Sequence, residues 1–282
     1  MTTVTKRSAI GNCHCGCFRF QISIDDKTNP ISCTCTLCRK KGYIWLVADD
    51  HEYKVVRDDG RLTDYRTNII QDQFCNKCGT GVVAKHPGGP LAGRLLVNAR
   101  TIQGLNPFEL ESRISILTTD DNDMKLAGGI QDSGSSSDSV KHKGSCHCGQ
   151  VWVELLAALQ DLEVKEDNCS LCVRNAFIGV YPSKEEVRIH GRENTFEYKC
   201  GRKFIGTLHC STCGVTVFTN VYGPPLSVFD RVPPERKEVV MAAYRKNMNI
   251  QPLNVRALED VDLAMLQIKR SDEGTEGYTL ED

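Results

Sequence analysis

The sequence predicts a mostly β protein built from two tandem copies of one domain. Short runs such as 18–24 alternate apolar and polar residues, which is typical of half-buried strands. The run GNCHCG at 11–16 recurs almost unchanged as GSCHCG at 144–149, and CNKCG at 75–79 recurs as CSTCG at 210–214. Two motifs that repeat in the same order indicate a tandem duplication.

Between the two copies the chain becomes rich in Asp, Ser and Gly, which is the composition of a linker. In the second copy a longer interval follows the CSTCG motif before the motif NVR, the counterpart of NAR in the first copy, and this places an insertion near 224–249. We therefore expect a first domain at 1–118, a flexible linker at 119–143 and a second domain at 144–282.

Charge and hydropathy exclude several classes of protein. The 282 residues carry a net charge of −1, which gives no general attraction to nucleic acid or to anionic membranes. No apolar run approaches the length of a membrane span, and the first residues lack the apolar stretch of a secretory leader. We therefore expect a cytoplasmic protein without nucleic-acid or membrane partners. The sequence does not indicate an oligomeric state.

Fifteen cysteines in a chain of this length, with no secretory leader, predict metal sites rather than disulfides. In the first copy, a C-x-C pair and a C-x-x-C pair together supply a closed set of four thiolates for a tetrahedral zinc ion. These four are Cys13, Cys15, Cys75 and Cys78.

A separate C-x-C-x-x-C run concentrates three more thiols, Cys33, Cys35 and Cys38. Cysteines one residue apart are poorly placed to bridge each other, but they can converge on one zinc ion. Three protein ligands leave a fourth coordination position open, which distinguishes a catalytic zinc from a closed structural one. The sequence therefore places the chemistry at these three cysteines.

The second copy differs at this run, because Asp167 takes the position of Cys33 while Cys169 and Cys172 take those of Cys35 and Cys38. Zinc accepts a carboxylate oxygen, so Asp167, Cys169 and Cys172 are candidate ligands, with Cys200 as an alternative third ligand. The other interpretation is that this site is degenerate. A carboxylate is harder than a thiolate, so we expect weaker zinc retention here. The second copy would then pack against the first, and its insertion would wall the first site.

These motifs resemble those of the glutathione-dependent formaldehyde-activating enzymes, whose pattern is G-x-C-x-C-G, then C-x-C-S-x-C, then F-C-x-x-C-G. The resemblance covers about 11–107 and about 144–258. It implies a β-tent fold of mostly antiparallel sheets in each copy. It also implies a structural zinc on the four cysteines of the first copy and a labile catalytic zinc on the C-x-C-x-x-C run. The structural zinc would recur on Cys146, Cys148, Cys210 and Cys213.

The resemblance further implies a carbon–sulfur lyase with glutathione as a candidate co-substrate. At an open zinc site a bound thiol loses its proton and attacks a small carbonyl carbon, formaldehyde in the nominal reaction of the family. The substrate would be a small molecule such as a glutathione adduct. Arg100 and Arg256 recur at matching positions, either to contact a carboxylate of glutathione or to form internal ion pairs.

Two other functions are compatible with these motifs. A duplicated domain of this kind can be a tailoring enzyme of specialised metabolism, or a non-catalytic zinc-binding module for protein interaction, as in the relatives found in centromere protein V. None of the histidines stands out as a dedicated base. His14 and His147 are expected to pack or hydrogen-bond beside the structural zinc, and the others, His86 among them, to be surface or satisfied residues.

Overall fold

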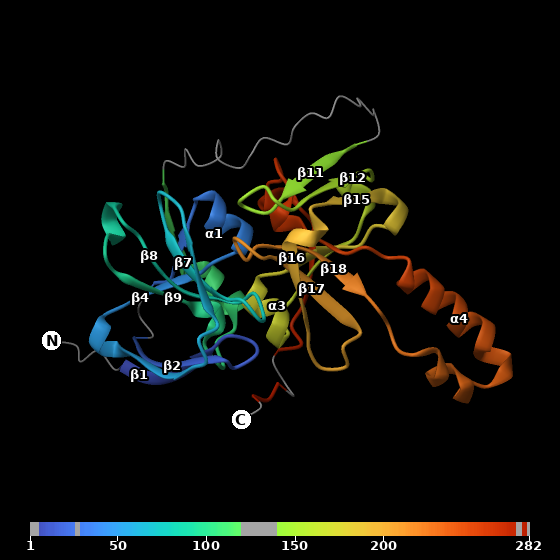
Figure 1. Cartoon of the computed structure of the whole chain (residues 1–282), viewed down its shortest axis with the longest axis horizontal. Coiled ribbons are helices and arrows are strands. Elements are labelled where there is room, and N and C mark those ends of the chain that lie inside the picture. The colour runs from blue at the N-terminus through green and yellow to red at the C-terminus, as the bar shows by residue number, and fades with distance from the viewer. Residues whose placement is uncertain (1–5, 26–28, 120–139, 275–277, 281–282) are drawn as a thin grey trace.

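The computed structural model describes residues 6–25, 29–119, 140–274 and 278–280. It confirms a mostly β chain whose strands form four sheets, a three-stranded and a seven-stranded sheet in each half (Figure 1). Within these residues no helix has the length and apolar character needed to cross a membrane. Most of the predicted linker lies outside the described residues, and the chain is already in a strand at His142.

The described residues of the first domain form ten strands and two short α-helices. The strands are β1 (Lys6–Asn12), β2 (Phe18–Asp25), β3 (Ile31–Cys33), β4 (Trp45–Ala48), β5 (Tyr53–Asp58), β6 (Leu62–Arg66), β7 (Gln71–Cys75), β8 (Gly81–Lys85), β9 (Leu95–Asn98) and β10 (Ser115–Leu117). The helices are α1 (Thr36–Lys41) and α2 (Pro107–Leu110). The small sheet has the order β1-β2-β5, and the large sheet the order β10-β3-β4-β9-β8-β7-β6. Only β10 and β3 run parallel among these pairs.

The second domain repeats this arrangement. Its strands are β11 (His142–Ser145), β12 (Trp152–Leu155), β13 (Val164–Asp167), β14 (Ile178–Val180), β15 (Val187–His190), β16 (Thr195–Lys199), β17 (Ile205–Cys210), β18 (Thr216–Val221), β19 (Leu253–Asn254) and β20 (Ile268–Ser271). Its helices are α3 (Ser170–Asn175) and α4 (Pro234–Met248). The large sheet, β20-β13-β14-β19-β18-β17-β16, matches that of the first domain strand for strand. The tandem duplication inferred from the cysteine motifs is therefore visible in the topology.

The hydrophobic core is continuous between the two domains. One cluster of buried side chains joins Trp45 and Leu96 of the first domain to Phe218 and Leu253 of the second. Burial of shared apolar surface is the main favourable term in holding two domains together. The two halves of the chain therefore pack as one body.

The contacts between the domains are reciprocal, as in a symmetric dimer. Lys40 on α1 donates from Nζ to the carbonyl oxygen of Ser145 at 2.9 Å. Arg174, at the matching position on α3, donates from Nε to the carbonyl oxygen of Asn12 at 3.1 Å. Because Asn12 and Ser145 are also matching residues, each domain offers the same surface to the other, the property of an isologous interface.

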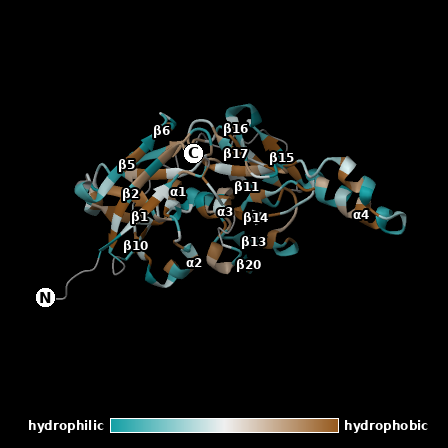
Figure 2. Cartoon of the chain, turned by 90° about the horizontal axis from the view of Figure 1, so that it is seen from below, coloured by the Kyte–Doolittle hydropathy of each residue, from teal (hydrophilic) through white to brown (hydrophobic). Residues whose placement is uncertain are grey.

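The insertion of the second domain contains α4, which projects from the end of the molecule that lies away from the first domain (Figures 1 and 2). None of its residues is buried, and the ring of Tyr244 packs on Phe229 of the same insertion at 5.0 Å between centroids. The expectation that this insertion walls the Cys33 site is therefore wrong, because the helix extends in the opposite direction.

Candidate metal centres

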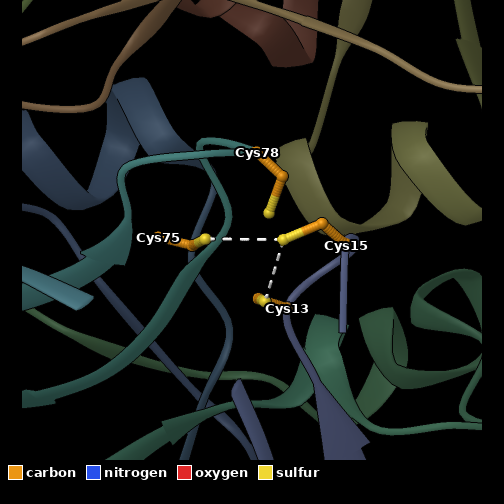
Figure 3. Close-up of side chains that lie close together, drawn as sticks. All are labelled: Cys13, Cys15, Cys75 and Cys78. Carbon is orange, nitrogen blue, oxygen red and sulfur yellow. Dashed lines mark hydrogen bonds between the residues drawn. The ribbon is translucent and has the colours of Figure 1, made fainter. Parts of the chain in front are cut away.

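The four cysteines expected to form a closed site in the first domain lie together (Figure 3). Their sulfur atoms are all within 4.8 Å of one another, and Sγ of Cys15 lies 3.6 Å from that of Cys13 and 3.7 Å from that of Cys75. If a zinc ion lay 2.3 Å from both sulfurs of such a pair, the S–Zn–S angle would be about 103° to 107°, close to the tetrahedral value. This donor set is therefore suited to zinc.

The second domain holds a cluster of the same geometry, made of Cys146, Cys148, Cys210 and Cys213. The sulfur of Cys148 lies 3.5 Å from those of Cys146 and Cys210. In both clusters three of the four cysteines are buried and the second is partly exposed. The duplication has therefore preserved both the residue types and their arrangement.

The electrostatics of these clusters favour a bound cation. The hydrogen bond with Cys15, then those with Cys75 and Cys78, raise the pKa of Cys13 far above its usual value, and burial adds to the effect. The hydrogen bond with Cys148 does the same to Cys146. Hydrogen bonds from the same partners lower the pKa of Cys75 and of Cys210, so without a metal the thiols of each cluster ionise unequally, whereas a divalent metal ion holds all of its thiol ligands deprotonated.

Glycine closes each C-x-x-C turn at a position that a side chain could not occupy. Gly79 has φ of +74° and donates its N–H to the carbonyl of Cys75 at 2.8 Å, and Gly214 has φ of +69° and does the same to Cys210 at 2.9 Å. A Cβ on Gly79 would lie only 2.0 Å from the ring of His209 in the other domain. The glycine thus permits both the turn and the close approach of the two domains.

The three-cysteine run also forms a cluster. Cys33 ends β3 while Cys35 caps α1 and Cys38 lies in its first turn, and the three sulfur atoms are within 4.8 Å of one another. The exposed fractions of the three residues are only 1%, 2% and 1%. Trp45 Nε1 donates to Sγ of Cys38 at 3.3 Å, and the backbone N–H of Cys35 points at Sγ of Cys33 at 3.4 Å. Such donors stabilise negatively charged sulfur.

Residues 8–118 match the model of the glutathione-dependent formaldehyde-activating enzyme family. The match spans most of the first domain. A crystal structure of a Rhodobacter sphaeroides protein aligns with 39% of this chain and 99% of its own, at 26% identity and a TM-score of 0.34.

One residue beside the Cys33 cluster was missed by the sequence analysis. His86 directly follows β8 and is 3% exposed, and its Nε2 atom is buried without a hydrogen-bond partner among the described residues. Alternation along the strand places its side chain on the face of Ala84, which packs in the same core cluster as Cys33. After the hydrogen bonds with Cys35 and Cys38, interaction with His86 also lowers the pKa of Cys33. His86 therefore borders the Cys33 cluster, although among the described residues the ligand atoms within 4.8 Å of one another are those of the three cysteines.

A cavity of about 210 Å³ touches the Cys33 cluster through Cys38. It lies between the two domains and is lined by Arg100 of the first and Arg256 of the second. Burial, and then the charge of Arg256, lower the pKa of Arg100 to about 9. A larger cavity of about 620 Å³ also has Arg100 and Pro107 in its wall, so Arg100 borders both spaces.

The two arginines do not form the internal ion pairs considered above. Nε of Arg100 donates to the carbonyl oxygen of Gly42 at 2.7 Å, and Nε of Arg256 donates to that of Ala176 at 2.8 Å. Glu111, which lines the cavity, is held by Arg270 through two bonds of 2.8 Å and 2.5 Å. In the described part of the chain no carboxylate lies within ion-pair distance of Arg100 or Arg256. Buried Arg100 and partly buried Arg256 thus border the cavity without a carboxylate at ion-pair distance.

The run of the second domain does not gather three ligand atoms. Sγ of Cys169 lies 2.9 Å from Sγ of Cys172, while Oδ1 of Asp167 accepts the backbone N–H of Cys169 at 2.7 Å. Cys200 is half-buried, and burial followed by the charge of Cys169 raises its pKa. Among the described residues, the cysteine groups suited to a metal are the three clusters already described.

His14 and His147 make hydrogen bonds beside the four-cysteine clusters, and their partners lie across the domain interface. Nδ1 of His14 is 2.8 Å from the hydroxyl of Tyr198, and Nδ1 of His147 is 2.8 Å from that of Tyr65. Burial lowers the pKa of His14 to about 4, so this ring is neutral near pH 7. These histidines therefore link the domains.

Proposed function

We propose that this protein is a zinc-dependent enzyme of the carbon–sulfur lyase class, which activates a small acidic thiol for reaction with a small electrophile. Glutathione is the candidate thiol, and formaldehyde the nominal electrophile of the family. Support comes from the family match of residues 8–118 and from one observation above all, a cavity lined by Cys38 and by two arginines, Arg100 and Arg256, that have no carboxylate at ion-pair distance. A thiol that also carries carboxylates fits this cavity, because its sulfur can lie near Cys38 and a carboxylate can lie near the arginines.

In this mechanism Cys33, Cys35 and Cys38 hold a zinc ion, and the other two clusters hold structural zinc ions. Zinc, when bound, supplies a Lewis acid that lowers the pKa of a thiol and polarises a carbonyl group. Trp45 fixes Sγ of Cys38 through its indole N–H. Arg100 and Arg256 bind a carboxylate of the substrate and so orient its sulfur toward the cluster. The smaller cavity is below the usual size of a ligand site, so it holds the thiol end, with the rest of the tripeptide beyond Arg100 in the larger cavity.

One observation favours a second candidate function, a non-catalytic zinc module. The Cys33 cluster is almost fully buried, and movement of the buried His86 ring into ligand distance would close it as a Cys₃His site of the structural kind. In that case all zinc ions would be inert toward added thiols.

The deciding experiment is a zinc count on the purified full chain before and after dialysis against glutathione, together with NMR detection of S-hydroxymethylglutathione formed from glutathione and formaldehyde. We expect one zinc ion per cysteine cluster, and we expect only the ion at Cys33, Cys35 and Cys38 to respond to glutathione. Two results together would establish the non-catalytic module instead. The zinc content of every cluster would be unchanged by glutathione, and the product would form no faster than in the absence of protein.

A further inference from the structure

We propose that Cys169 and Cys172 form a redox-active dithiol, which is oxidised to an intramolecular disulfide by small-molecule disulfides. They occupy the positions of Cys35 and Cys38, but their surroundings differ from those of a metal site in three respects. The proposal does not depend on the catalytic role of the first domain.

The first difference is the distance between the two sulfur atoms. It is 2.9 Å, whereas in the two four-cysteine clusters Cys15 and Cys148 each lie 3.5 Å to 3.7 Å from two neighbouring sulfurs. A zinc ion bound to both sulfurs at 2.3 Å would have to accept an angle of about 78° between them, far below the tetrahedral value. The pair is too close to share a zinc ion and is already placed for a bond between its members.

The second difference is the loss of the third ligand. Asp167 stands where the first domain has Cys33; its Oδ1 accepts the backbone N–H of Cys169 at 2.7 Å, and its carboxylate forms no group with both sulfurs inside the 4.8 Å that holds the three sulfurs of the first domain. That bond fixes the residue at the start of α3 and turns the carboxylate toward the backbone. Two sulfurs without a third donor do not make a zinc site of either the structural or the catalytic kind.

The third difference is access. Cys169 and Cys172 are both partly exposed, whereas Cys35 and Cys38 are almost fully buried. A reagent in solution therefore reaches the pair of the second domain more easily. The hydrogen bond between the two sulfurs also lowers the pKa of Cys169 to about 7, in the range of the C-x-x-C motifs of disulfide oxidoreductases.

The chemistry balances with a small disulfide such as oxidised glutathione as the oxidant. The thiolate of Cys169 attacks one sulfur of the reagent, which breaks the S–S bond, forms a mixed disulfide and releases one glutathione thiolate. Cys172 then loses its proton to solvent and attacks Sγ of Cys169, which releases the second glutathione. The protein loses two electrons and two protons, and one oxidised glutathione becomes two reduced molecules.

The test uses the full zinc-loaded chain in buffers with a decreasing ratio of reduced to oxidised glutathione. Each sample is quenched in acid, alkylated with N-ethylmaleimide and digested with trypsin. Cleavage after Lys165 and Arg174 isolates 166–174, which contains Cys169 and Cys172 and no other cysteine. At oxidising ratios we expect the mass of this peptide to fall by two hydrogens and the peptide to carry no N-ethylmaleimide. After reduction it should carry two N-ethylmaleimide groups. The zinc content should stay constant throughout.

The internal control is the tryptic peptide that ends at Arg39 and carries Cys33, Cys35 and Cys38. It should keep its thiols at ratios where 166–174 is oxidised. The proposal is overturned if 166–174 oxidises no earlier than the control peptide, or if it oxidises only after a chelator has removed zinc, because the pair would then be a metal site.

Three variants give independent tests. Cys172→Ser should stop at one glutathione adduct on Cys169, and Cys200→Ser should behave like the wild-type chain. Asp167→Cys restores the three-thiol run of the first domain, so we expect one additional zinc ion per chain and loss of the early oxidation. Disulfide formation that requires Cys200 would contradict the pairing. Because the main measurement is made on the unmodified chain, the folding of a variant does not decide the result.

Discussion

The imidazole of His14 in the first domain and the hydroxyl of Tyr198 in the second are joined by a 2.8 Å hydrogen bond, beside the first four-cysteine cluster. Tyr65 and His147 repeat this contact with the domains exchanged. Nε2 of His14 also lies 3.1 Å from the hydroxyl of Ser170 at the start of α3. The turn that carries Cys13 and Cys15 is thereby fixed against the other domain.

Tyr198→Phe removes the phenol partner of His14 and leaves a buried ring nitrogen without it. We expect the free energy of unfolding to fall by about 1 to 3 kcal/mol, the usual cost of an unsatisfied buried polar group, with unchanged zinc content. Thermal unfolding and metal analysis measure both. Tyr222→Phe is the matched control, because it loses an exposed bond to Glu197 and should change stability little. Equal effects of the two substitutions would show that the contact between the domains contributes no more to stability than an exposed hydrogen bond does.

The two kinds of cysteine cluster should respond differently to loss of one thiol. Cys75→Ser opens a closed four-thiolate site, whose metal binding contributes directly to folding, so we expect an unfolded or insoluble first domain. Cys38→Ser should leave a folded protein that has lost one zinc ion and its activity. Circular dichroism and zinc analysis distinguish the outcomes. If both variants are equally damaged, the division into structural and catalytic sites is wrong.

The sequence was sufficient for the local features of this protein. Alternation predicted β2, where Phe18, Phe20 and Ile22 point into the core, and the repeated motifs predicted which cysteines lie together. Both signals depend on neighbouring residues and on the chemistry of thiols.

What could not be predicted depends on packing between distant segments. The histidine pattern did not reveal that His86 faces the Cys33 cluster, although its position two residues after Ala84 in an alternating strand was an available signal. The shared cavity of Arg100 and Arg256 arises only when two domains meet face to face. The sequence also could not predict the direction in which α4 projects. None of its residues is buried, so it has no apolar face to indicate where it packs.

His86→Ala tests whether this imidazole contributes to the Cys33 cluster. We expect zinc at that cluster to be lost at lower chelator concentrations, by about 10- to 100-fold, while the four-cysteine clusters keep their metal. The measurement is competition with a chromogenic chelator. His190→Ala is the control, because His190 is partly exposed and belongs to none of the groups of possible metal ligands in the described residues. Unchanged chelator sensitivity in His86→Ala would mean that the ring only fills space in the core.

The last prediction concerns the two arginines that border the cavity. Each donates its Nε–H to a backbone carbonyl, so the N–H donors that remain for a ligand are those of the terminal nitrogens. Arg100→Met and Arg256→Met should each raise KM for glutathione by about 10- to 100-fold, since a hydrogen bond to a charged group contributes about 1.5–3 kcal/mol. The zinc content should not change.

A thiol without a carboxylate, such as 2-mercaptoethanol, separates anion recognition from a general effect on the site. The wild-type chain should prefer glutathione, and the two variants should lose that preference while they process the simple thiol as before. Arg188→Met serves as the control, because Arg188 is exposed and pairs with Glu154 far from Cys38 in the sequence. If the variants slow both thiols equally, or lower the melting temperature without altering KM, the arginines support the domain interface and the carboxylate of the substrate binds elsewhere.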